Sequence, residues 1–325
     1  MELNNSINNN NNNNIESNLN KINLNINNSN LKSLTICSIT WNMHGECPSN
    51  SIIFDLLSPH LKERYDIYCI GSEECLRSIF KSLFYSDKSY WEISLSEIFN
   101  KNFYYLFSSY TLAAIHLVIF VKIELKKYIK LISTNEVKTG GYNLIGNKGG
   151  VSILLNIYNL NIMIINCHLA ARKDYSTKRN DNFKRIVDKF ITINKQIDFI
   201  IFMGDLNYRL NTDKFNIETI KQNYKEYLIF DQLIFERNNN RLKVDYFLEG
   251  EINFLPTFKY KNGTDEFDNS KKDNNPAWTD RILFLKKNTI KNVFDVSLKK
   301  YDSMQNIIMS DHKPVYAYFE LIIQN

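Results

Sequence analysis

Eight short runs of Ile, Val, Leu, Phe and Tyr recur along this chain of 325 residues, and they constrain its fold more than any other feature. Such runs are typical of buried β-strands, because β-branched and aromatic side chains fit a pleated surface. The strands that we expect are Leu34–Thr40, Ile67–Ile70, Tyr104–Ser109, Ala113–Val121, Val151–Leu155, Ile162–His168, Phe199–Met203 and Val315–Leu321.

A helical pattern stands between two of these runs. Phe183, Ile186, Val187 and Phe190 are spaced three and four residues apart, which predicts a helix with one face packed on a sheet. Many strands with helices between them favour an α/β sandwich of two sheets flanked by helices.

The amino terminus has a different composition. Residues 1–33 are dominated by asparagine, with an unbroken run from Asn8 to Asn14, and offer little apolar area to offset the entropy of ordering. We expect a disordered tail over residues 1–33 and one folded domain over residues 34–325.

Targeting and redox signals point to the cytoplasm. The amino terminus lacks a basic patch followed by an apolar stretch, and the apolar run Leu112–Val121 is shorter than the roughly 20 residues that span a bilayer. The five cysteines are odd in number and lack CxxC spacing, which is typical of reduced thiols. A formal net charge of +5 favours anionic partners, and we expect a monomer.

Polar side chains follow the ends of several expected strands. Asn42 follows the first strand and Glu73–Glu74 the second, while His168, Asp205 with Asn207, and Ser310–His312 stand beside later ones. Strand ends hold side chains in fixed positions beside a cleft, and carboxylate and amide oxygens suit Mg²⁺. No zinc-spaced Cys/His cluster, P-loop or GxSxG sequence is present.

Eight segments in order resemble the inositol polyphosphate 5-phosphatases, a family within the superfamily that includes deoxyribonuclease I. PAWTDRIL, GNKGG and PTFKY are the most specific of them. The segments are TWNM at Thr40–Met43, Glu73–Glu74, GNKGGVS at Gly146–Ser152, NCHLAA at Asn166–Ala171, GDLNYR at Gly204–Arg209, PTFKY at Pro256–Tyr260, PAWTDRIL at Pro276–Leu283 and SDHKPV at Ser310–Val315.

The resemblance implies a fold and a reaction. The fold would be a four-layer α/β sandwich of the deoxyribonuclease I type, with two packed mixed β-sheets flanked by helices. The reaction would be Mg²⁺-dependent removal of the 5-phosphate from soluble inositol phosphates or from phosphoinositides. Glu74 and Asn42 would hold the Mg²⁺ with Asp311 nearby, while Asp205 would orient and deprotonate the attacking water beside Asn207.

The resemblance also implies which residues grip the substrate. His312, oriented by Asp280, and His168 would contact the scissile phosphate. Lysines of the polar stretch Lys259–Asn275 would hold the 4-phosphate, and further anion contacts would come from other basic and amide side chains. The substrate-binding residues would be Lys259, Lys272, Asn147, Lys148, Arg209 and Arg172.

Several positions depart from the family pattern. His44, Glu73, Arg172 and Phe258 replace the usual Asn, Gln, His and Tyr, and Asn274 and Thr279 replace the usual Arg and Cys. We expect Glu73 to add negative charge near the metal, Phe258 to lose a hydroxyl contact, and Arg172 to alter the ring phosphates that are favoured.

Two other functions are weighed against this hypothesis. An endonuclease of the same fold would share the metal and Asp205, but the chain shows no arginine-rich groove, so we expect no nucleic-acid partner. A non-catalytic phosphoinositide-binding scaffold would be free to lose catalytic residues, yet all are present. Contact with the anionic cytosolic face of a membrane fits the lipid substrates.

Overall fold

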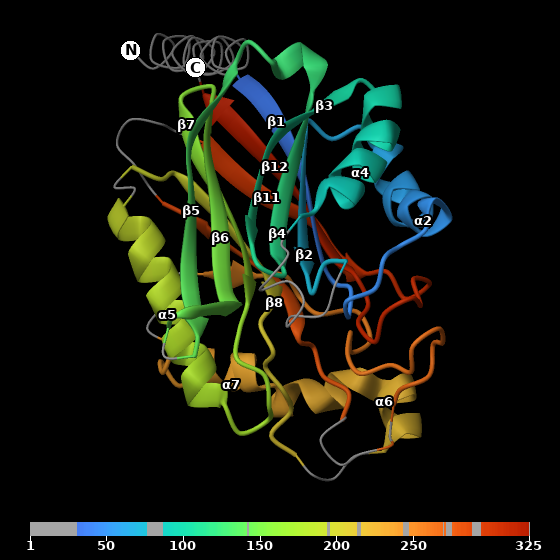
Figure 1. Cartoon of the computed structure of the whole chain (residues 1–325). Helices are drawn as coiled ribbons and strands as arrows, with labels where there is room; N and C mark the ends of the chain where they lie inside the picture. Colours follow the sequence, from blue (N-terminus) through green and yellow to red (C-terminus); the bar gives the residue numbers. More distant parts are fainter. Residues whose placement is uncertain are drawn as a thin grey trace, which may run out of the picture.

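The computed structural model describes residues 31–76, 87–141, 143–193, 196–212, 216–242, 247–268, 270, 275–287 and 294–324. Two six-stranded sheets pack face to face, with helices on their outer sides (Figure 1). The predicted four-layer α/β sandwich of two mixed sheets is confirmed. The predicted tail over residues 1–30 lies outside the described part of the chain.

The first sheet is mixed, with β1 and β2 parallel and the other neighbours antiparallel. Its strand order is β11-β12-β1-β2-β4-β3. The strands are β1 (Leu31–Asn42), β2 (Ile67–Glu73), β3 (Tyr104–Leu112), β4 (Ile115–Lys122), β11 (Phe294–Ser303) and β12 (Val315–Gln324).

The second sheet is also mixed, with β7 and β8 parallel and the other neighbours antiparallel. Its strand order is β5-β6-β7-β8-β10-β9. The strands are β5 (Ile129–Gly140), β6 (Ile145–Ile157), β7 (Leu160–His168), β8 (Phe199–Asp205), β9 (Leu248–Glu249) and β10 (Asp280–Lys286).

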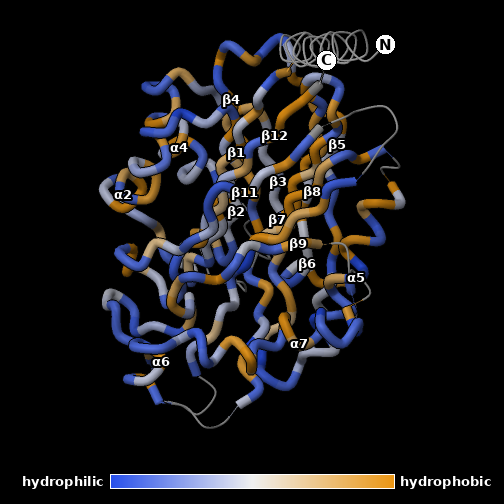
Figure 2. Tube along the Cα trace, turned by 180° about the vertical axis from the view of Figure 1, so that it is seen from behind, coloured by the Kyte–Doolittle hydropathy of each residue, from blue (hydrophilic) through white to orange (hydrophobic). Residues whose placement is uncertain are grey.

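Strand alternation builds three apolar layers. In β1, Leu34 and Ile36 enter the core between the sheets, whereas Cys37 and Ile39 face the helices outside, because successive side chains of a strand point to opposite faces. Apolar residues accordingly concentrate on the strands (Figure 2).

Helices cover both outer faces. Apolar side chains of α2 (Asn50–Leu61) and α4 (Ser89–Lys101) pack on the first sheet. The predicted helix is α5 (Ser176–Ile193), and its four predicted apolar residues are all buried in the cluster that covers the second sheet. The shorter elements are α6 (Ile217–Asn223), α7 (Gln232–Asn238) and the 3-10 helices η1 (Ile123–Leu125) and η2 (Tyr224–Phe230). In the described ranges, no helix is both long and apolar enough to cross a membrane.

All eight predicted strands are present, but β1 begins at Leu31, so residues 31–33 belong to a strand and not to the predicted tail. The sequence did not identify β5, β9, β10 or β11 as strands. The edge strand β5 is mostly exposed or half-buried, and its sequence mixes Lys, Ser, Thr, Asn and Glu with apolar residues. Such an edge strand carries no continuous apolar run.

Candidate active site

The two parallel strand pairs deliver polar residues to the same end of the sandwich. Asn42 ends β1, and His168 and Asp205 end β7 and β8, where they are paired in register. Asp280 begins β10 directly opposite Asp205. The Asn42 side-chain amide donates to the Asp205 carboxylate (Nδ2 to Oδ2, 3.0 Å), a bond that joins the two sheets. These four residues are almost fully buried.

Asp205 accepts hydrogen bonds from several sides. The backbone and side-chain amides of Asn207 each donate to it over 3.0 Å, and Nε2 of His168 lies 3.1 Å from its Oδ2. Burial alone would raise the pKa of Asp205, but His168, with His312 and Lys148, lowers this pKa well below its usual range. Asp205 is therefore an ionised carboxylate held in one orientation.

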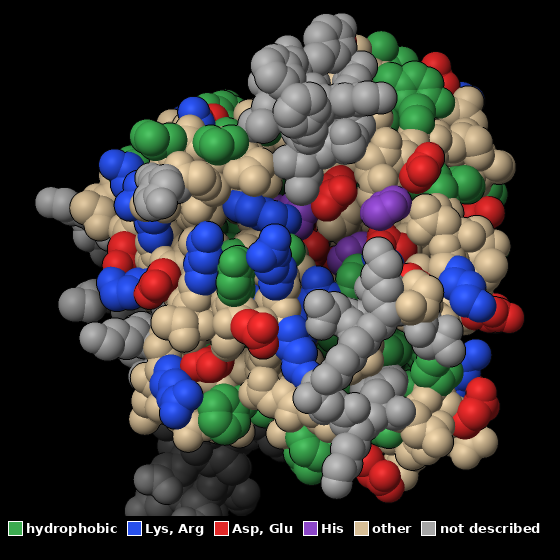
Figure 3. All heavy atoms as spheres, turned by 60° about the horizontal axis from the view of Figure 1, so that its bottom comes forward, with side chains coloured by type: hydrophobic (Ala, Val, Ile, Leu, Met, Phe, Trp, Pro, Cys, Tyr) green, Lys and Arg blue, Asp and Glu red, His purple; other side chains and the backbone are tan. Residues whose placement is uncertain are grey.

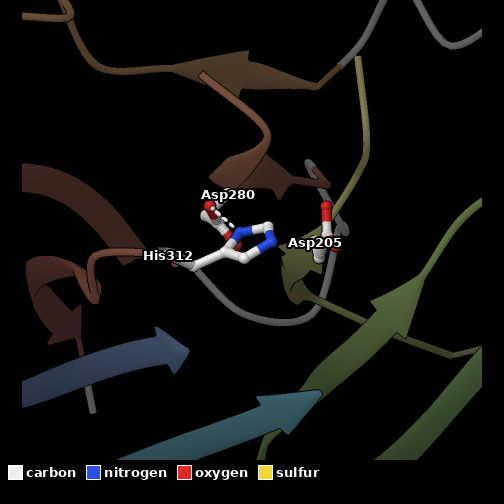
Figure 4. Close-up of side chains that lie close together, drawn as sticks. All are labelled: Asp205, Asp280 and His312. Carbon is white, nitrogen blue, oxygen red and sulfur yellow. Dashed lines mark hydrogen bonds and ion pairs between the residues drawn. The ribbon is translucent and has the colours of Figure 1, made fainter. Parts of the chain in front are cut away.

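His312 lies between two carboxylates (Figure 4). Its Nδ1 is 2.9 Å from Oδ2 of Asp280, and its other ring nitrogen faces Asp205. Burial alone would lower the pKa of His312, but Asp280 raises it to about 10. In the described residues these three are the one His/Cys/Asp/Glu group close enough to hold a metal. A protonated imidazole has no free lone pair, so this group suits proton and phosphate contacts better than a cation.

Two threonines and an aromatic ring hold the Asp280–His312 pair in place. Thr257 and Thr279 donate to Oδ2 of Asp280 over 2.7 and 2.9 Å. The Phe258 ring lies 4.5 Å from the His312 ring and 4.1 Å from the Arg209 guanidinium. Sequence reasoning noted only the lost hydroxyl of Phe258 and missed Thr257, although both belong to the PTFKY segment. The ring packing explains how Phe258 contributes without a hydroxyl group.

A lysine side chain lies beside His168. Its Nε2 contacts the ammonium group of Lys148, while its Nδ1 is buried without a hydrogen-bond partner in the described chain. Burial lowers the pKa of His168 and lowers that of Lys148 to about 8. A pocket of about 260 Å³ adjoins this pair and is lined by Asn147, Lys148 and Arg172. The structure thus brings these three predicted substrate residues together.

The predicted metal ligands meet at the end of β1 and β2. Asn42 is paired with Glu73 in the sheet, and the backbone of Glu74 accepts a hydrogen bond from Gly45, so Asn42 and Glu74 lie on neighbouring segments. Glu74 is half-buried, and its carboxylate has no hydrogen bond or ion pair with any residue of the described ranges. A carboxylate and an amide oxygen carried on neighbouring segments are ligand types that suit a hard divalent cation.

Asp311 binds two other site residues. Its Oδ1 lies 3.2 Å from Nδ1 of His44, and its Oδ2 lies 3.5 Å from the ammonium group of Lys259. The hydrogen bond to Asp311 raises the pKa of His44. Burial would raise the pKa of Asp311, but His44 and other cations lower it to about 2. His44 therefore joins the site as a partner of Asp311.

Glu73 differs from its sequence-based expectation. It is fully buried and accepts hydrogen bonds from the Thr40 hydroxyl over 3.2 and 3.3 Å. Burial, with Asp280 and Asp205, raises the pKa of Glu73 well above its usual range, which favours the neutral acid. The expected extra negative charge near the metal is therefore not supported.

The end of the molecule seen in Figure 3 shows how these groups are distributed. Histidine and acidic side chains lie in a hollow, and Lys and Arg side chains gather beside it. Arg209 donates to Oδ1 of Asn207 over 2.8 Å, which places it in the same cluster. Lys272 and Asn274 lie outside the described residues.

Comparison with known proteins identifies the family. A family model described as endonuclease/exonuclease/phosphatase family 2 matches residues 39–318. This chain belongs to that family. The family's relatives include the type II inositol 1,4,5-trisphosphate 5-phosphatase of Mus musculus, which is 32% identical over 306 residues, covering 87% of this chain and 29% of the relative. The predicted kinship with inositol polyphosphate 5-phosphatases is confirmed.

A second relative is inositol polyphosphate 5-phosphatase K of Mus musculus, which is 30% identical over 315 residues. The match covers 89% of this chain and 66% of that relative. The chain therefore spans less than two thirds of the length of either relative.

Solved structures show the same fold. The inositol polyphosphate 5-phosphatase domain of a synaptojanin, in complex with inositol (1,4)-bisphosphate and calcium ion, has a TM-score of 0.77 and 27% identity, covering 95% of this chain and 91% of that chain. A Cimex nitrophorin has a TM-score of 0.68 and 22% identity, covering 90% of this chain and 99% of that chain. Because a nitrophorin shares the fold, the fold alone does not define the chemistry.

Proposed function

We propose that this chain is a Mg²⁺-dependent phosphatase that removes the 5-phosphate from inositol phosphates or phosphoinositides. One observation carries the proposal: Asp205, held by Asn42, Asn207 and His168, faces the protonated His312–Asp280 pair across a buried site. The names of the relatives and the inositol bisphosphate bound to the synaptojanin domain support this reaction class.

The metal would be held by Glu74 and Asn42, with Asp311 nearby. A bound Mg²⁺ supplies Lewis acidity toward a phosphoryl oxygen and offsets developing negative charge. The calcium ion in the synaptojanin domain supports a divalent cation in this family's fold. The carboxylate of Glu74, which has no ion pair within the described ranges, supports the assignment on this chain.

The other site residues would each have a separate role in the reaction. Asp205, kept ionised, orients the attacking water and accepts its proton, while Asn207 keeps the Asp205 carboxylate in position. His312, kept protonated by Asp280, donates to a phosphoryl oxygen, and Lys148, held beside His168, supplies positive charge from the other side. Lys259 would pair with the 4-phosphate, since its ammonium group is partly exposed beside Asp311.

A phosphate-release assay tests the function. With Mg²⁺, purified protein should release phosphate from inositol 1,4,5-trisphosphate or from a 4,5-bisphosphorylated lipid, and EDTA should abolish that release. Product analysis should find the 5-position free. Release that survives the chelator would contradict the metal assignment, and no release from any such substrate would favour a binding scaffold. Faster cleavage of abasic DNA would favour an endonuclease.

Contact with a membrane surface belongs to the same proposal. Leu144 in the turn between β5 and β6 and Ile145 at the start of β6 are 78% and 44% exposed, two to three residues from Asn147. Apolar side chains beside cationic groups favour an anionic bilayer, which supports the proposal that the enzyme acts in the cytoplasm at the cytosolic face of membranes.

The membrane contact has its own test. Leu144→Asp should weaken sedimentation with vesicles of phosphatidylserine and phosphatidylcholine several-fold, because burying a carboxylate in the interface is costly. Hydrolysis of soluble inositol 1,4,5-trisphosphate should stay unchanged. Equal vesicle binding by the variant and the parent would remove this turn from the contact surface. Ile229→Asp, an exposed apolar residue elsewhere, is the matched control.

A further inference from the structure

Lys313 is fully buried directly after His312, although lysine is rarely buried without a partner. Its ammonium group donates to two backbone carbonyl groups, that of Ile307 over 3.0 Å and that of Thr264 over 3.4 Å. It also lies 4.5 Å from the centre of the Tyr260 ring. A buried cation satisfied by carbonyl groups and an aromatic face fixes the segments that supply them.

Those partners belong to two segments that meet over the active site. Residues 257–268, here called the lysine segment, contain Lys259. Residues 304–312, here called the histidine segment, contain Asp311 and His312. Thr264 and Tyr260 come from the lysine segment and Ile307 from the histidine segment, so the Lys313 ammonium contacts both.

Backbone hydrogen bonds join the same two segments. Tyr260 donates to Asp311 over 3.0 Å, Gly263 donates to Ile308 over 2.8 Å, and the Lys313 amide donates to Thr257 over 2.8 Å. The Tyr260 hydroxyl donates to Gln305 over 2.8 Å. The Lys313 ammonium adds contacts to both segments of this ladder, and Lys259 directly precedes Tyr260.

We propose that Lys313 is a positioning residue, whose buried ammonium ties the lysine segment to the histidine segment and so places Lys259 for the 4-phosphate. This role rests on the proposed function, in which Lys259 binds that phosphate. Lys313 touches no reacting group, and Asp280 of the catalytic pair keeps a hydrogen bond from Thr279, which lies outside both segments.

The kinetic test compares two substrates that differ only in the 4-phosphate. Lys313→Met keeps the aliphatic stem and removes the donors. It should raise KM for inositol 1,4,5-trisphosphate roughly tenfold, because a charge-assisted contact is misplaced, with kcat little changed. KM for inositol 1,5-bisphosphate should stay within about twofold, since no 4-phosphate is present to be misplaced. Equal losses on both substrates would overturn the proposal.

Two further variants separate positioning from general destabilisation. In a Lys259→Ala background, Lys313→Met should cause no further loss of preference for the 4-phosphate, because the group that it positions is gone. An additive loss there would overturn the proposal. Lys313→Arg should restore part of the preference, whereas Lys261→Met, an exposed lysine of the same segment, should leave both substrates unaffected.

Hydrogen exchange gives a readout that does not need activity. In Lys313→Met, amides of residues 257–268 should exchange at least about tenfold faster, while amides of α5 keep their rates, because only the tie between the two segments is lost. Unchanged exchange would overturn the proposal even where phosphate release fails. If Lys313→Met does not fold, Tyr260→Phe, which removes the bond to Gln305, should shift exchange in the same direction by a smaller factor.

Discussion

At the scale of single residues, the site holds an ionised Asp205 close to a protonated His312, although an imidazole in water is mostly neutral at pH 7. Asp205 stays ionised because His168, His312 and Lys148 surround it, and His312 stays protonated because Asp280 accepts its Nδ1 proton. A carboxylate with such a low pKa is a weak base, so its orientation of the water matters at least as much as proton acceptance. Under the proposed function, the two groups would act as a fixed dipole across the scissile phosphate.

Asp205→Asn tests this assignment. The substitution keeps the shape but replaces a carboxylate oxygen by an amide group, so we expect kcat to fall by at least ~10² with a smaller change in KM. Single-turnover phosphate release measures it. Asp188→Asn on the exposed side of α5 is the matched control. A near parental rate for Asp205→Asn would show that another residue positions the water.

At the scale of elements, the sequence predicted the strands and the helix that contain a regular apolar pattern, and the site residues that belong to a fixed motif. The eight strands and α5 follow from periodicity, and the meeting of Asn42, Asp205 and His312 follows from motif positions at strand ends. The edge strand β5 was missed because exposed strands mix polar and apolar residues. The ring packing of Phe258 and the neutral state of Glu73 were missed because both depend on neighbours brought together only by folding.

The contact between α2 and β12 contains a buried histidine. Nδ1 of His60 lies 2.5 Å from the Tyr318 hydroxyl, and Nε2 lies 3.3 Å from the Met304 sulfur. Burial, helped by the charge of Lys300 on β11, lowers the pKa of His60 to about 4. The folded chain therefore keeps His60 neutral where the unfolded chain would be protonated.

The sign of the pH effect follows from linkage. As the pH falls, His60 of the unfolded chain takes up a proton at about pH 6.5, whereas His60 of the folded chain does so only near pH 4. The folded state therefore loses free energy of unfolding as the pH falls from 6.5 to 4. At pH 5 the loss is about 2 kcal/mol. We expect His60→Leu to reduce the drop in unfolding free energy between pH 7.5 and 5 by that amount, measured by urea unfolding. His116, whose pKa is also lowered by burial, is present in the parent protein and in the His60→Leu variant, so it contributes equally to the pH dependence of both. An unchanged drop would contradict a neutral His60.

At the scale of the whole molecule, a buried ionic network joins both sheets to the outer helices. Arg281 on β10 donates to Asp231, which caps α7, and to Glu249 on β9 over 2.6 and 2.8 Å. Tyr301 on β11 of the other sheet donates to the same Glu249 over 3.0 Å. Because Arg281 directly follows Asp280, the network also anchors the strand that begins at the active site.

Removing the cation should destabilise the entire fold. Arg281→Met leaves Asp231 and Glu249 buried without their main partner, so we expect the free energy of unfolding to fall by about 3–5 kcal/mol. Lys286→Met on the same strand breaks an exposed pair with Asp295 and should cost less than about 1 kcal/mol. Urea unfolding followed by circular dichroism measures both. Adding Glu249→Gln to Arg281→Met should recover part of the lost stability, because one buried carboxylate without its partner is removed. A further additive loss would show that the network stabilises the fold through packing and not through charge.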